Sequence, residues 1–139
     1  MGCDIHLHSE IKVNGKWLHY DQPDCDRNYE LFEKMAGVRG ENKNAIAAPR
    51  GLPEDASDTT NFESDHWDSD GHSHSWLSAA EIHQLAEWYR EEFKGRDKDN
   101  FWPKWDRWLC GNCYSDFVRY PESRPKEIED VRFVFWFDN

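Results

Sequence analysis

The first twenty residues contain the pattern that most constrains the fold, a strict alternation followed by a turn dipeptide. Apolar and polar side chains alternate from residue 3 to residue 13, and Ser9 is the only polar residue on the apolar side. A period of two predicts a strand with one buried face. The dipeptide Asn14-Gly15 is the preferred two-residue loop of a β-hairpin. We therefore expect a hairpin whose return strand covers residues 16–20.

Two helices and a last strand are also predicted. Asp26 is placed to cap a helix from residue 27 to about residue 36, and Gly37 would end it. Ser78 and Glu81 have the spacing of a capping box before an apolar stripe that ends at Gly95. Residues 130–137 alternate again, which predicts a strand that pairs with the hairpin.

Two segments have no such periodicity. Residues 38–74 are rich in Gly, Pro, Ser, Asp and Asn, and a loop of that length is expected to be functional. Residues 96–109 concentrate aromatic side chains and are expected to form an irregular lid over the core. The fold class predicted for residues 1–139 is a single α+β domain. Its antiparallel sheet would consist of the N-terminal hairpin and the C-terminal strand, covered by two helices.

Charge and hydropathy limit the kinds of molecule that this protein is expected to bind. The formal net charge is −11 and the pI is about 5.0, which disfavours duplex nucleic acid and anionic membranes because both require a basic surface. The same charge permits docking on a basic protein. No apolar run approaches the roughly 20 residues of a membrane span. The four cysteines are expected to be reduced in a cytosol.

The polar side of the first strand is a candidate metal site. Asp4, His6 and His8 alternate, so they share one face at spacings of about 6.6–6.8 Å and could converge on a divalent metal such as zinc or manganese. An ordinary polar strand face is the alternative. The segment Asp4-Ile5-His6-Leu7-His8-Ser9 resembles the opening metal motif of the polymerase-and-histidinol-phosphatase phosphoesterases, which implies metal-dependent hydrolysis. That family continues promptly with Ser-Asp-Gly, which occurs here only at residues 69–71.

A second pattern with metal-ligand spacing is Cys110-Gly111-Asn112-Cys113. It is half of a structural zinc site, which needs four ligands. Gly-Asn is also an acceptable hairpin turn, which would explain the close spacing without a metal.

Three arginines and a polar run that enters the second helix are candidates for binding a phosphate. Arg27 stands at the start of the first helix, Arg39 just past its end, and Arg50 in a turn stiffened by Pro and Gly. A guanidinium on such a rigid loop is pre-organised for anions, and the start of the second helix offers unpaired amide groups. Pairing with nearby acids, or satisfaction of the loop backbone, is the alternative. The candidate ligand-binding residues are Arg27, Arg39, Arg50, His72, Ser73, Ser75 and Trp76.

Several blocks together resemble an uncharacterised small-protein family of tailed bacteriophages. They are residues 1–6 (Met-Gly-Cys-Asp-Ile-His), 27–29 (Arg-Asn-Tyr), 36–39 (Ala-Gly-Val-Arg), 49–53 (Pro-Arg-Gly-Leu-Pro) and 72–77 (His-Ser-His-Ser-Trp-Leu). The resemblance implies a viral accessory protein in the cytoplasm of a bacterial host. By analogy of context, such proteins often counter host defence by sequestering or degrading nucleotide immune signals.

The leading functional hypothesis is therefore a protein that binds and sequesters a small phosphorylated, nucleotide-like ligand. One alternative is a metal-dependent phosphoesterase that uses Asp4, His6 and His72. The other is an acidic inhibitor that docks on a basic host protein.

Overall fold

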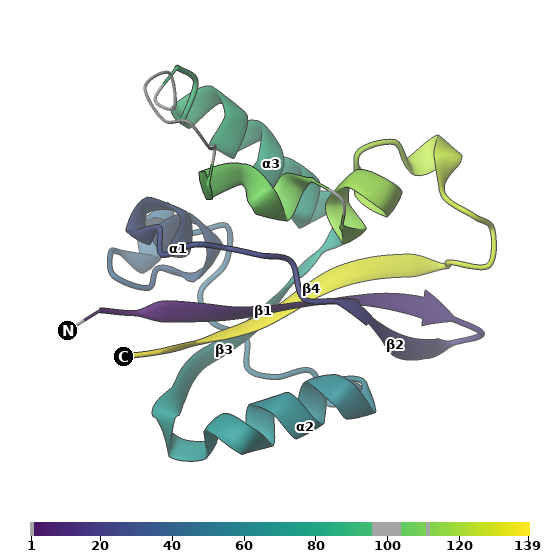
Figure 1. Ribbon diagram of the computed structural model, residues 1–139, viewed down its shortest axis with the longest axis horizontal. Coiled ribbons are helices and arrows are strands. Elements are labelled where there is room, and N and C mark those ends of the chain that lie inside the picture. Colours follow the sequence, from purple (N-terminus) through teal and green to yellow (C-terminus); the bar gives the residue numbers. More distant parts are fainter. Residues whose placement is uncertain (1, 96–103, 111) are drawn as a thin grey trace.

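The computed structural model describes residues 2–95, 104–110 and 112–139 (Figure 1). Its centre is an antiparallel sheet with the strand order β2-β1-β4-β3. The strands are β1 (Asp4–Val13), β2 (Lys16–Asp21), β3 (Gly71–Ser78) and β4 (Asp130–Asp138). Helices flank this sheet, so the predicted α+β fold is confirmed.

The hairpin and the last strand form as predicted. Asn14 and Gly15 have φ angles of 51° and 76°, which lets β1 turn directly into β2. β4 pairs with β1 along its whole length, from Asp4 opposite Asp138 to Lys12 opposite Asp130. The two strands predicted furthest apart in the sequence are therefore neighbours at the centre of the sheet.

Helices and short helical segments cover one face of the sheet (Figure 1). α1 (Tyr29–Ala36) and α3 (Ala79–Glu92) lie on the side of the buried rings of Phe133, Phe135 and Phe137, and α3 begins with the predicted capping box. The short segments beside them are Lys104–Leu109, Tyr114–Val118 and Pro121–Ser123.

The start of α1 differs from the prediction. The helix begins two residues later than expected and is capped by Asn28, whose side-chain oxygen accepts a hydrogen bond from the Leu31 amide. Gly37 ends it in the left-handed conformation, as predicted. The predicted aromatic lid over residues 96–109 lies mostly outside the described residues, although Trp108 is buried in the core.

The long segment expected to be a loop contains a helix and a strand. α2 (Asp58–Trp67) was missed because the residues it buries are Thr60 and Ser64, so it has no apolar stripe. β3 was missed because its sequence, Gly-His-Ser-His-Ser-Trp-Leu-Ser, is poor in β-branched residues. Two short turns, Asn42–Asn44 and Asp68–Asp70, complete the segment. α2 lies on the face of the sheet opposite α1 and α3 (Figure 1).

Candidate functional site

The face of the sheet beneath α2 carries a layer of histidines around one tryptophan. Alternation along the strands turns His6 and His8 of β1 to this face, together with Trp136 of β4. Their ring centroids lie 5.9 and 5.0 Å from that of Trp136, and the centroid of His74 from β3 lies 5.6 Å from it. Histidines of β1 and of β3 thus meet at Trp136.

Burial disfavours the protonated form of three histidines on this face, His8, His19 and His74. His8 is buried, and Nδ1 of His8 lies 3.0 Å from Nε2 of His19 on β2. Burial, followed by the neighbouring His19, lowers the pKa of His8 to about 4. Burial also lowers the pKa of His19 and of His74. Nε2 of His6 is hydrogen-bonded to the carboxylate of Asp138 on β4.

Next to this layer lies a buried ion pair. Nε and Nη2 of Arg132 lie 2.8 and 2.7 Å from Oε1 of Glu10, and the guanidinium also reaches Asp55 at 3.0 Å. The other carboxylate oxygen of Glu10 accepts hydrogen bonds from the Ser57 amide and the Thr60 hydroxyl, each at 2.8 Å. Burial alone would raise the pKa of Glu10, but these hydrogen bonds hold it below its ordinary value.

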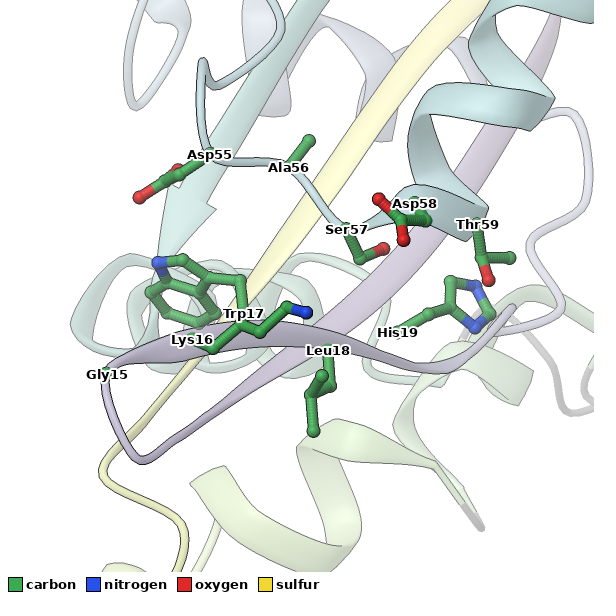
Figure 2. A pocket seen from close by; sticks show the side chains of 10 residues that line it. All are labelled: Gly15, Lys16, Trp17, Leu18, His19, Asp55, Ala56, Ser57, Asp58 and Thr59. Carbon is green, nitrogen blue, oxygen red and sulfur yellow. The ribbon is translucent and has the colours of Figure 1, made fainter.

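A pocket opens at the edge of the same face, between β2 and the start of α2 (Figure 2). Its volume is about 450 Å³. Trp17 and Asp55 lie at one end in Figure 2, and His19 and Thr59 lie at the other. The guanidinium of Arg132 covers the Trp17 ring at 4.0 Å, so the buried ion pair supports the wall of the pocket. The lining residues are Gly15, Lys16, Trp17, Leu18, His19, Asp55, Ala56, Ser57, Asp58 and Thr59.

The arginines predicted to clamp a phosphate have separate partners. Arg27 pairs with Asp4 at 2.9 Å, and Arg39 lies over the ring of Tyr29 at 5.1 Å, both near the first residues of β1. Arg50 makes a two-pronged contact with Glu81, with distances of 2.7 and 2.6 Å. These contacts place Arg50 beside α3, and the structure does not bring the three guanidinium groups to one ligand.

The other predicted ligand-binding residues occupy β3. Nδ1 of His72 contacts the Ser73 hydroxyl, and the buried Ser75 hydroxyl accepts a hydrogen bond from the Arg50 amide at 3.1 Å. The Trp76 ring lies 4.4 Å from the guanidinium of Arg50. Serines 73 and 75 are therefore part of a strand and its edge, and they do not belong to the start of α3.

The residues predicted to hold a metal each have a different partner. Asp4 binds Arg27, His6 binds Asp138, and His8 binds His19. Across residues 2–95, 104–110 and 112–139, no three His, Cys, Asp or Glu side chains are placed to hold a metal ion.

The residues named for phosphoester hydrolysis, and the two close cysteines, are likewise separated. His72 lies opposite Phe137, on the other face of the sheet from His6, which lies opposite Trp136. Cys110 is exposed whereas Cys113 is buried, and both are free thiols.

The pocket residues were not predicted from the sequence, although two signals point to them. In the hairpin register His19 lies opposite Glu10, and Trp17 lies opposite Lys12, so both share the polar face of β1. Ser57 stands three residues before Thr60, and it caps α2 by accepting a hydrogen bond from the Thr60 amide.

Within the described residues, no helix combines the length and apolar character needed to cross a membrane. No protein-family model, curated protein or solved structure matches the chain.

Proposed function

We propose that the protein binds a small phosphorylated, nucleotide-like molecule in the pocket between β2 and the start of α2. The observation that carries this proposal is the combination of groups around one cavity. A lysine, the first turn of a helix and an indole ring line the same 450 Å³ space. These are groups that can bind a phosphate and a base in the same molecule.

The phosphate would lie between Lys16 and the start of α2. The amides at the first positions of a helix have no acceptor within the helix, and they carry partial positive charge. Asp58 and Thr59 occupy these positions in α2 and line the pocket. Lys16 supplies the full positive charge from the opposite wall.

The base and sugar would lie toward Trp17. Trp17 is 9% exposed and Arg132 covers its ring at 4.0 Å, so a base would contact only the part of the ring that faces the pocket. A fully stacked base contributes about 1–3 kcal/mol in single-strand complexes, which is the upper limit for this contact. The carboxylate of Asp55 is offset by Arg132 at 3.0 Å, so it can accept a hydrogen bond from a sugar hydroxyl without adding an unpaired charge beside the phosphate.

The proposed biological role is an analogy of context, taken from the resemblance to a phage protein family that has no established activity. Such a protein would act in the host cytoplasm by holding a nucleotide signal and lowering its free concentration. Sequestration involves no bond cleavage, so it requires only the binding groups described above and no catalytic residue.

Calorimetric titration with inorganic phosphate, nucleosides, mononucleotides and cyclic nucleotides tests the proposal. We expect at least one nucleotide to bind with one site per chain and to exceed its nucleoside in affinity. Lys16→Ala is expected to weaken that binding at least tenfold. Lys43→Ala is the matched control, because Lys43 is an exposed lysine paired with Glu41 away from the pocket. Absence of binding across the panel, or equal affinity for Lys16→Ala and the wild type, would refute the proposal.

A further inference from the structure

α2 has little apolar surface in contact with the sheet, and of its two aromatic apolar side chains Trp67, at its end, packs there against His6. The two residues that it buries, Thr60 and Ser64, both carry hydroxyl groups. Its one phenylalanine, Phe62, is 70% exposed. Hydrophobic burial therefore contributes little to holding this helix, and its opening free energy is expected to be well below that of α1 and α3.

Polar and ring contacts hold the helix at both ends instead. At its start, Glu10 accepts hydrogen bonds from the Ser57 amide and the Thr60 hydroxyl, and Arg132 reaches Asp55. At its end, the ring of Trp67 lies 4.1 Å from that of His6. α2 is thus a cover whose attachment depends on the protonation and charge of the groups beneath it.

His8 and His19 are bonded to each other through their ring nitrogens. A hydrogen bond between Nδ1 of His8 and Nε2 of His19, 3.0 Å apart, needs one nitrogen with a proton and one without. If both rings were protonated, two N–H groups and two positive charges would face each other. The closed structure therefore excludes the doubly protonated pair.

The other charged groups that face this pair do not remove that conflict. Glu10 is the nearest acid on β1, but Arg132 and the α2 hydrogen bonds already use its oxygens. Asp21 of β2 and Glu63 of α2 act on His19 only at longer range, as charges.

The remaining imidazoles near this pair have other surroundings. Burial, followed by the neighbouring His72, lowers the pKa of His74 on β3. His6 is bonded to Asp138 on β4. His66 of α2 lies next to Trp67 at the far end of the helix, with ring centroids 6.1 Å apart.

We propose that α2, with the segment 55–57 before it, is a lid that opens when the histidine layer takes up protons in mild acid. Opening lets water reach His8 and His19, so that each ring can be protonated without its neighbour. The α1 and α3 side of the sheet, whose contacts are apolar, stays closed. Ser57, Asp58 and Thr59 form one wall of the pocket, so opening would also release the ligand; this last step rests on the proposed function.

Hydrogen–deuterium exchange of the free protein at pH 7.5 and pH 5.0 tests the lid without any ligand. Protection factors are compared for residues 58–67 and, as the internal control, residues 79–92. If one histidine has its ordinary pKa of 6.5 in the open state, the equilibrium constant for opening is about 30-fold larger at pH 5.0 than at pH 7.5. We expect α2 to lose protection by at least that factor and α3 to lose much less.

Two variants separate the histidine pair from other effects of acid. His8→Gln with His19→Gln keeps two groups that can hydrogen-bond to each other and cannot be protonated, so α2 should keep its protection at pH 5.0. His83→Gln, an exposed histidine on α3, should behave as the wild type. If the double variant does not fold, the wild-type comparison of α2 with α3 still decides.

The lid is refuted if α2 keeps its protection at pH 5.0, if α3 loses protection equally, or if the folded double variant opens like the wild type. The binding proposal is tested at neutral pH by titration, so failure of either proposal leaves the other standing.

Discussion

Replacing both members of the Glu10–Arg132 pair is expected to destabilise the protein by less than the sum of the two single replacements. The exposed fractions of the two side chains are 0% and 8%, and the guanidinium contacts the carboxylate at 2.8 and 2.7 Å. Arg132→Met leaves the Glu10 carboxylate buried with only two neutral donors. Glu10→Leu leaves the guanidinium of Arg132 beneath Trp17, and only Asp55, at the pocket rim, remains as a charged partner. Breaking a buried pair in this way costs about 3–5 kcal/mol.

The double variant, Glu10→Leu with Arg132→Met, removes both charges. Its free energy of unfolding is therefore expected to fall by less than the sum of the two single changes. Without Glu10, the Ser57 amide and the Thr60 hydroxyl each lose their acceptor, which costs about 1–3 kcal/mol per group and therefore about 2–6 kcal/mol in all. The two single changes would sum to about 6–10 kcal/mol if they were independent. Comparison of the midpoints of these two ranges gives an expected interaction energy between positions 10 and 132 of about 4 kcal/mol.

Urea unfolding followed by tryptophan fluorescence measures these free energies at pH 7. A low temperature, about 10–15 °C, keeps the single variants folded near the maximum of stability. Arg27→Met is the matched control, because its partner Asp4 is about half exposed and solvent screens the pair. Its urea midpoint should equal that of the wild type. Additive effects of the two buried changes, or single changes no larger than the control, would contradict the reasoning.

Two further predictions concern the buried histidine and the cysteines. The pKa of His8 is about 4 in the folded protein, against 6.5 for an unperturbed histidine, so the unfolded state binds the proton first as the pH falls. On account of this residue, the free energy of unfolding should fall by about 3 kcal/mol between pH 6.5 and pH 4. His8→Gln should make the unfolding free energy less dependent on pH over this range. An unchanged slope in the variant would contradict a neutral, buried imidazole. Burial raises the pKa of the Cys25 and Cys113 thiols to about 12, whereas Cys110 is exposed. A thiol reagent should therefore show one fast phase that Cys110→Ser removes, and a fast phase that persists in this variant would count against the assignment.

Local sequence patterns were enough to predict an element where its own residues stabilise it or where it buries one apolar face. Asn14 and Gly15 set the hairpin, because few other pairs adopt two positive φ angles in succession. The capping box of Ser78 and Glu81 and the alternation of β4 also predicted their elements correctly, because both patterns lie within a few residues of sequence. α1 began after Asn28 and not after Asp26 because two residues close together were both suitable caps.

α2 escaped prediction because its partners lie elsewhere in the chain. Its attachment depends on Glu10 and Arg132, 47 and more residues away in sequence, and no local pattern records such a contact. The partners of Arg27 and Arg50 were equally hidden, since Asp4 and Glu81 belong to other elements.

The class of fold and the polar character of one sheet face could be read from the chain alone, because alternation and turn chemistry act over a few residues. Which groups come together on that polar face depends instead on long-range packing. The histidine layer, the buried ion pair and the pocket are each assembled from segments that are distant in the chain. Side chains of β1, β2, β4 and α2 come together there because the apolar face opposite packs into the core.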